Sequence, residues 1–218
     1  EATLSNYEWS AYDEIIDNLS VNWYLNDYLT VKGQFSVTKQ YTSSERFYDP
    51  LSSKVSVYGT TDTKLQGDLF TGEGSSLSWN SNAFLYYTRS FGNHNFNFSG
   101  GWEASAYNTE NTSAQYRGFP SGQFNSLNYA SEIYKKPTLT ENTTRRVSIL
   151  ATLNYTWNDI YLADASVRFD GSSEFGANQK WAPFFSGGLG VNIHNYDFLK
   201  GNEKINKVKV RASYGRTG

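Results

Sequence analysis

The sequence has neither cysteine nor methionine among its 218 residues, and it contains only 2 histidines and 4 prolines. The lack of cysteine excludes disulfide frameworks, thiolate metal sites and cysteine nucleophiles, and it is compatible with a bacterial envelope protein that folds without cross-links. No stretch approaches the roughly 18 apolar residues of a membrane-spanning helix, and no signal peptide opens the chain. Because Met is absent, we expect either a mature protein or a piece of a longer one.

An excess of charge of one sign is also missing. The 19 Lys and Arg residues nearly balance the 21 Asp and Glu residues, which leaves a formal net charge of −2. Nucleic-acid binding requires a basic surface that such a balance does not supply. We therefore expect no nucleic-acid partner.

Aromatic residues, in contrast, are abundant, with 17 Tyr, 14 Phe and 6 Trp. This content, together with many Asn, Ser, Thr and Gly residues, favours strands and turns over helices. So many rings with so little net charge also argue against a disordered chain. The composition predicts a folded, all-β protein.

Apolar and polar residues alternate through residues 29–41, over about a dozen positions, which is longer than an ordinary globular strand. We expect one set of side chains to face lipid and the other to face a wet lumen, because lysine on the lipid side near the bilayer midplane costs roughly 2 to 4 kcal/mol. The expected lipid-facing residues are Leu29, Val31, Phe35 and Val37, and the expected lumen-facing residues are Thr30, Lys32, Gln34 and Ser36.

The same alternation predicts four strand pairs, joined by connections of two kinds. Short turns are expected at residues 26–27, 92–95 and 158–159, and long polar loops at 42–76, 108–144 and 170–181. A helical turn, with Asn195 as its N-cap and Phe198 and Leu199 against the rim, is expected within residues 194–203. This asymmetry, with aromatic rings near the short turns, is typical of a transmembrane β-barrel.

The sequence disfavours two alternatives to the barrel. A soluble β-sandwich also alternates, but the long strands, the long loops and the weakly apolar second face disfavour it. An enzyme is disfavoured because both histidines, His94 and His194, fall at the short-turn end, and we expect no cofactor or metal. The stretch at residues 170–173 could mimic a cation loop, but we favour a strand end capped by Asp170, with Gly171 relaxing the backbone.

Aromatic residues of the long segments are the candidates for substrate binding, although they could equally pack the loops together. They are Phe47, Tyr48, Tyr58, Tyr116, Phe119, Phe124 and Tyr129.

Residues 168–190 resemble the signature of SusC/RagA-type TonB-dependent outer-membrane transporters. In that family an arginine precedes Asp-Gly-Ser-Ser, followed by Phe-Gly, a short polar loop, an aromatic residue and a proline at the next strand. The matching positions are Arg168, Asp170, Gly171, Ser172, Ser173, Phe175, Gly176, Trp181 and Pro183. This chain departs from the pattern by inserting Phe184 and Phe185 before Ser186.

The resemblance implies an antiparallel barrel of about 22 strands, of which residues 1–218 would form about eight within a single barrel domain. It also implies the outer membrane of a Gram-negative bacterium and import of oligosaccharides or peptides. The partners would be membrane lipid, a SusD-like lipoprotein and TonB. No segment resembles the plug domain or the TonB box, so we expect a central or later part of the barrel whose first and last strands do not pair. The alternative is a transporter-like barrel that serves as a structural subunit of an envelope complex.

Overall fold

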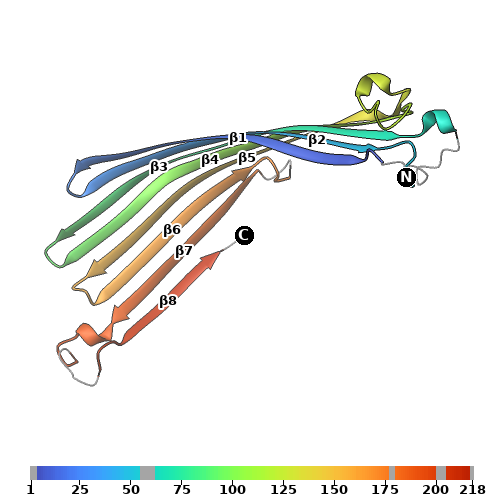
Figure 1. Ribbon diagram of the computed structural model, residues 1–218. Coiled ribbons are helices and arrows are strands. Elements are labelled where there is room, and N and C mark those ends of the chain that lie inside the picture. The colour runs from blue at the N-terminus through green and yellow to red at the C-terminus, as the bar shows by residue number, and fades with distance from the viewer. Residues whose placement is uncertain (1–3, 55–61, 177–179, 200–204, 217–218) are drawn as a thin grey trace. The chain divides into compact units, whose positions relative to one another are not determined.

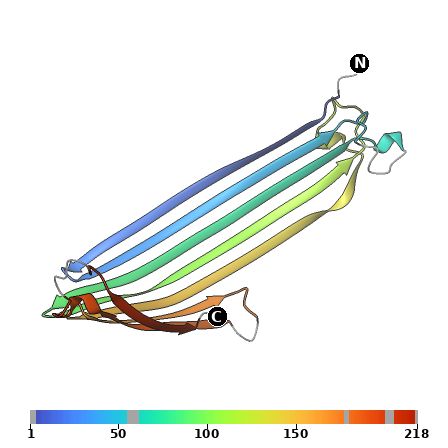
Figure 2. The same cartoon turned by 90° about the horizontal axis from the view of Figure 1, so that it is seen from below.

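The computed structural model describes residues 4–54, 62–176, 180–199 and 205–216. They form one sheet of eight antiparallel strands, in which each strand lies beside the next in chain order (Figures 1 and 2). The strands are β1 (Tyr7–Asn26), β2 (Leu29–Tyr48), β3 (Asp68–Phe91), β4 (His94–Arg117), β5 (Glu132–Trp157), β6 (Tyr161–Ser172), β7 (Trp181–Asn192) and β8 (Lys209–Arg216). Three short 3-10 helices interrupt the connections: η2 (Thr63–Leu65), η3 (Leu127–Tyr129) and η4 (Ile193–Asn195).

The strand order confirms the predicted all-β fold. In the described part of the chain, β1 and β8 are not neighbours in the sheet, as expected for strands that do not close a barrel on themselves. No helix in the described ranges is long and apolar enough to cross a membrane.

The first five strands correct the predicted loop boundaries. They contain 20 to 26 residues each, about twice the 9 to 11 residues of a membrane-crossing strand. The connections therefore shrink to residues 49–67 and 118–131. The prediction failed because apolar residues such as Phe47 and Leu69 are isolated among polar ones in these strand extensions, so the extensions lack the sustained alternation that predicts strands.

The short turns lie within one or two residues of their predicted places, at 27–28, 92–93 and 158–160, although His94 and Asn95 belong to β4. Their backbone geometry explains the residues found there. Asn158 and Asp159 have φ values of 54° and 56°, and Gly92 has φ 56°. Asn, Asp and Gly tolerate this left-handed conformation better than other residues. At the first turn, the side-chain oxygen of Asn26 accepts a hydrogen bond from the Tyr28 backbone at 3.1 Å.

The helical turn after β7 lies near its expected place, but its cap was predicted wrongly. The turn begins at Ile193, its N-cap is Asn192, and Asn195 is its last residue. Asn195 instead donates to the backbone oxygen of Asp159 at 2.7 Å, which holds the segment against the turn between β5 and β6. The ring of Phe198 stacks on Tyr196 at 5.6 Å, and the last expected positions of this segment, from residue 200 on, lie outside the described residues.

The contacts divide the chain into two compact units, which are described separately. Unit 1 comprises residues 1–16, 38–78 and 107–143, and unit 2 comprises residues 17–37, 79–106 and 144–218. Unit 1 has a small core in which Phe47, Leu69 and Phe119 are buried, with Tyr7, Tyr116 and Ala130 packed around them.

The described residues of unit 2 form no comparable core, because its sheet has one apolar face and one polar face. Register places apolar residues side by side in rows across β5, β6, β7 and β8; one row is Leu153, Ala165, Gly187 and Tyr214, and the next is Tyr155, Ala163, Leu189 and Ala212. Leu189 is 69% exposed and Tyr214 is 76% exposed. A soluble sandwich would cover such a face, so this exposure argues against that alternative.

Strand β2 shows the same alternation in unit 2. It is continuous from Leu29 to Tyr48, so Leu29, Val31, Phe35 and Val37 lie on the face opposite to Thr30, Lys32, Gln34 and Ser36. The ammonium of Lys32 lies 5.3 Å from the ring of Tyr86 on the neighbouring strand.

Candidate functional site

The polar face of unit 2 is a hydrogen-bonded wall. Asp164 accepts from Arg211 across two strands at 2.7 Å. The hydroxyls of Ser166 and Ser186 are 2.7 Å apart, and those of Ser99 and Thr152 are also 2.7 Å apart. These side chains are too small and polar to form a dry core, whereas they suit a surface in contact with water.

Arg168, the first residue of the family signature, organises this wall. Its guanidinium donates to Asp170 at 2.6 Å and to the Ser148 hydroxyl at 3.1 Å, and it lies 3.7 Å from the carboxylate of Glu103. The predicted role of Asp170 was wrong, because this residue lies inside β6 and holds Arg168 rather than capping a strand end.

Gly171 also has a different role from the predicted one. It has no positive φ and lies opposite Trp181 in the ladder between β6 and β7. A Cβ atom at Gly171 would lie 3.1 Å from the indole ring of Trp181. A side chain at position 171 would therefore press on the Trp181 ring, which lies against the glycine.

The remaining signature residues close the loop that follows β6. The Ser172 hydroxyl accepts from the Glu174 backbone at 3.1 Å, and the Ser173 hydroxyl accepts from the Arg145 backbone at 2.9 Å. Glu174 is paired with Arg146 at 2.6 Å. Of the other signature residues, Phe175 is exposed and Gly176 has open space around it. Pro183 lies opposite Phe169 in the ladder between β6 and β7.

The two histidines belong to the aromatic region near the short turns. Nδ1 of His94 lies 2.7 Å from the Tyr155 hydroxyl, and its ring stacks between Phe91 and Tyr155. Nδ1 of His194 lies 2.9 Å from the backbone oxygen of Val208. Neither histidine has a carboxylate and a nucleophile beside it, so the described residues hold no hydrolytic triad. No group of three or more acidic or histidine side chains in the described ranges could hold a metal ion.

Unit 1 contains an open groove of about 690 Å³ that crosses five strands. Hydroxyl side chains on one face of the strands line much of it, from Ser10, Ser44, Ser113 and Thr138. The charged residues Glu8, Arg46 and Lys136 and the ring of Phe70 lie on the same face. The adjacent residues Trp9, Glu45, Thr71 and Lys135 border the groove, but their side chains alternate to the other face of the sheet. A Cβ atom at Gly72 would lie 2.7 Å from the Ser44 hydroxyl, so any larger side chain there would intrude on the groove.

The aromatic residues predicted to bind substrate are not among the residues that line this groove. Phe47 lies in β2 rather than in a loop, is 0% exposed, and meets the ring of Phe119 edge-on at 5.1 Å. Phe47 and Phe119 therefore offer no surface to a ligand. Tyr48 and Tyr116 are half-buried at strand ends, whereas Phe124 and Tyr129 are exposed and pack edge-on at 5.0 Å. Tyr58 lies outside the described residues.

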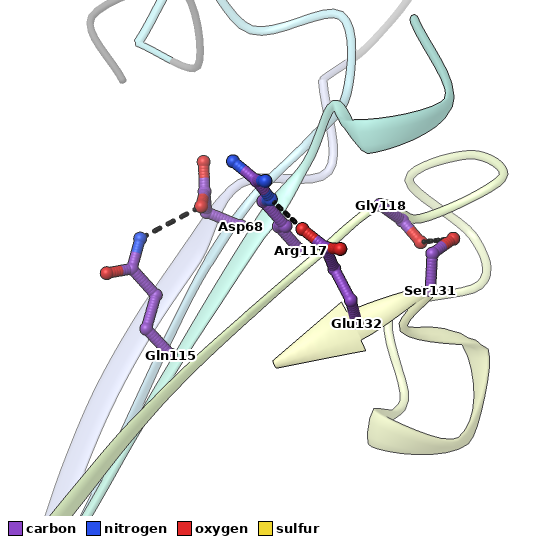
Figure 3. Close-up of polar contacts among 6 residues, drawn as sticks. All are labelled: Asp68, Gln115, Arg117, Gly118, Ser131 and Glu132. Carbon is purple, nitrogen blue, oxygen red and sulfur yellow. Dashed lines mark hydrogen bonds and ion pairs between the residues drawn. The ribbon is translucent and has the colours of Figure 1, made fainter. Parts of the chain in front are cut away.

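Polar contacts fix the ends of β3, β4 and β5 beside the core of unit 1 (Figure 3). Gln115 donates to the buried carboxylate of Asp68 at 3.0 Å, and Arg117 is paired with Glu132. Burial raises the pKa of the Asp68 carboxyl above its ordinary range, although Gln115 and the charge of Arg117 act in the opposite direction. The Ser131 hydroxyl donates to the Gly118 backbone oxygen at 2.8 Å, which anchors the loop that carries η3.

Sequence reasoning missed the groove residues Arg46, Gln115 and Lys136. Each lies in a strand extension for which the sequence pattern predicts a loop. The only signal that could have revealed them was the weak alternation of charged and hydroxyl residues.

Comparisons with known proteins agree with the geometry. No protein-family model matches the chain. TonB-dependent receptor P3 of Formosa agariphila is 35% identical over 136 residues, or 62% of this chain and 14% of the relative. TonB-dependent receptor SusC of Bacteroides thetaiotaomicron is 31% identical over 140 residues, or 63% of this chain and 13% of the relative. The chain corresponds to a barrel segment of SusC/RagA-type receptors.

The fold comparison finds the same strand architecture in a solved barrel. A solved structure of the RagAB peptide transporter superposes on 97% of this chain and 23% of its own, with a TM-score of 0.82 and 22% sequence identity. A structure of the same importer in a closed state gives a TM-score of 0.81. These relatives are receptors and transporters rather than enzymes, in agreement with the expectation of no catalysis. The SusC/RagA-type segment spans about a seventh of the length of the curated relatives that it matches.

Proposed function

We propose that this SusC/RagA-type segment forms part of the wall of an outer-membrane, TonB-dependent importer of large polar nutrients, within one larger barrel domain. The single observation that carries the proposal is the division of unit 2 into an exposed apolar face and a hydrogen-bonded polar face. A barrel wall needs lipid on one side and water on the other, and this division meets both needs.

The open ends of the sheet support a larger barrel. Unpaired backbone groups at a sheet edge are untenable in lipid, so β1 and β8 require partner strands. Since β1 and β8 are not neighbours, strands outside this segment would supply those partners. The groove of unit 1 would then offer a surface to solute, with the predicted aromatic Tyr48 against its Arg46 side chain, 5.6 Å from the ring centroid.

The partners follow from relatives and remain part of the proposal. RagAB is described as a peptide importer, and SusC as a TonB-dependent receptor. By this likeness, the complete protein would take energy from TonB and act with a SusD-like lipoprotein in the outer membrane of a Gram-negative bacterium.

The experiment is single-cysteine labelling in a background from which any cysteine outside these 218 residues has been removed, since the segment itself contains none. Cysteine is placed at Val167 or at Ser166, neighbours on opposite faces of β6, in the complete protein in native membranes. We expect a membrane-impermeant maleimide to label Ser166→Cys but not Val167→Cys, and a lipid-dissolved quencher to reach a dye only at position 167. Equal labelling of both positions contradicts a membrane wall.

Transport is tested separately from topology. Uptake of labelled oligosaccharides and peptides is compared between cells with and without the complete protein, and between cells with and without TonB. We expect uptake to require both. Uptake or complex assembly that is independent of TonB favours the scaffold alternative.

A further inference from the structure

We propose that the apolar face of unit 2 holds a binding site for an anionic phospholipid, in the membrane leaflet on the side of the short turns. Arg89 binds the phosphate of this lipid, and an apolar groove on the same face accepts one of its acyl chains. The inference rests on the proposed function, which places this face in lipid and the short turns in the periplasm.

Arg89 is a cation on an otherwise apolar face. Strand β3 is continuous through Phe91, so Arg89 lies on the same face as Tyr87 and Phe91. The turn after β3 has only two residues, since β4 begins at His94, and antiparallel pairing therefore places Arg89 beside Phe96. The rings of Phe91 and Phe96 stack at 5.3 Å, which agrees with this register.

The positive charge of Arg89 is not balanced by a carboxylate. Within the described residues its guanidinium forms no ion pair, and it lies over the ring of Tyr28, 4.9 Å from the centroid. Lipid has no water to solvate such a charge, so an anion at the membrane surface stabilises it. Phosphate suits this position because two of its oxygens match the parallel N–H donors of a guanidinium.

Aromatic side chains next to Arg89 mark the level of the lipid headgroups. His94 stacks on Phe91 at 5.5 Å and on Trp157 at 6.4 Å, and its Nδ1 atom lies 2.7 Å from the Tyr155 hydroxyl. Rings with an apolar body and a polar tip gather where acyl chains meet headgroups. A phosphate bound to Arg89 at this level places the rest of the lipid beside Tyr155.

Tyr155 is also a wall of an apolar groove of about 730 Å³. Phe96, the neighbour of Arg89, contacts Tyr155 at a ring distance of 4.7 Å and lines the groove as well. The other large walls are Leu153, Leu189 and Tyr214, which strand register places on the same face. An acyl chain fills such a groove without leaving any polar group unpaired. The lipid thus matches both the unpaired cation and the apolar groove beside it.

Binding is measured by native mass spectrometry on the complete protein, purified in detergent and stripped of lipid. The first probe is dioleoyl phosphatidylglycerol, which is anionic. The control probes are dioleoyl phosphatidylcholine, with the same chains but no net charge, and glycerol 3-phosphate, with the phosphate but no chains. We expect phosphatidylglycerol to bind about tenfold more tightly than either control probe.

Charge variants locate the headgroup. Arg89→Gln should weaken phosphatidylglycerol binding by about tenfold or more, since hydrogen bonds to charged groups are among the stronger ones. The matched control is Lys32→Gln. Lys32 is also an exposed cation above a tyrosine ring, that of Tyr86, but it lies on the polar face. Its loss should change the affinity less than about twofold.

Groove variants locate the acyl chain. Ala163 lies between Tyr155 and Leu189 in the floor of the groove, so Ala163→Leu should weaken phosphatidylglycerol binding several-fold. The control Ala151→Leu adds the same bulk to the same face outside the groove and should leave the affinity unchanged. Leucine suits a face in lipid, and unfolding temperatures show that both variants fold.

Three results overturn the inference: equal affinity for phosphatidylglycerol and phosphatidylcholine, equal loss in Arg89→Gln and Lys32→Gln, or unchanged binding in Ala163→Leu. Failure of the proposed membrane wall is recognised separately, because cysteines at positions 166 and 167 are then labelled equally. If the wall is correct and only the inference fails, position 167 stays protected while Arg89→Gln binds lipid like the unmodified protein.

Discussion

A lysine placed on the apolar face of unit 2 is the sharpest test of the membrane wall. Val167 lies near the middle of β6, between Ala151 and Phe185 on the neighbouring strands. Ser166, the next residue, lies on the opposite face between Thr152 and Ser186. The substitutions Val167→Lys and Ser166→Lys therefore introduce the same charge at almost the same height but on opposite sides of the sheet.

The expected difference follows from the environment of each side. Lysine facing lipid near the bilayer midplane costs about 2 to 4 kcal/mol, which corresponds to a loss of roughly 30- to 700-fold in the folding equilibrium. Lysine facing water costs far less, although Ser166→Lys also removes the hydroxyl contact with Ser186, worth about 0.5 to 1.5 kcal/mol.

Assembly and stability of the complete barrel provide the measurement. We expect Val167→Lys to lower the yield of folded protein in the outer membrane. We also expect it to lower the temperature at which the purified barrel unfolds in detergent. Ser166→Lys should remain near the unmodified protein. An equal or larger loss for Ser166→Lys would refute the assignment of the apolar face to lipid, and with it the orientation of the wall.

Three further predictions concern packing and charge. Gly171→Leu should destabilise the barrel by about 1 to 3 kcal/mol through overpacking, because a Cβ atom there would lie 3.1 Å from the Trp181 ring. The control Gly176→Leu, where a Cβ atom would meet no other atom within 4 Å, should leave the unfolding temperature unchanged. Equal unfolding temperatures for the two variants would contradict the prediction. Phe47→Ala should cost about 3 to 5 kcal/mol and expose residues 49–54 and 62–67 to protease, whereas Ala at exposed Phe124 should leave cleavage unchanged. For Asp68, a folded-state pKa above the unfolded value means that unit 1 is most stable below the unfolded pKa and loses that stability as pH rises through the folded pKa. Asp68→Asn should remove this loss, as seen in hydrogen exchange of residues 66–70 after correction for intrinsic rates, and an unchanged pH dependence would contradict the role of Asp68.

Several features of the fold could be predicted from the sequence because they depend on local chemistry. Alternation around residues 29–41, 147–157 and 185–193 reflects one face in lipid and one in water, so the strand pattern is present in the order of residues itself. Asn158-Asp159 and Gly92 marked their turns because those residues accept left-handed backbone angles. The signature at residues 168–190 likewise predicted the family without knowledge of any contact.

The extent of β1 to β5 could not be predicted in the same way. Beyond the alternating stretches apolar residues are isolated among polar ones, and only pairing with a neighbouring strand keeps such a segment extended. Phe47 shows the consequence, because the sequence assigned it to a loop as a binding candidate, whereas the structure buries it against Leu69 and Phe119 from distant parts of the chain.

The sequence by itself determined which residues alternate, where the chain reverses tightly and which family it resembles, since each depends on neighbours along the chain. Tertiary structure alone decided that Gly171 lies against the Trp181 ring, that Asp170 holds Arg168 near Glu103, and that Arg46, Gln115 and Lys136 line one groove. These relations join residues from different strands. Strand register sets such distances, and register becomes fixed only when the whole sheet pairs.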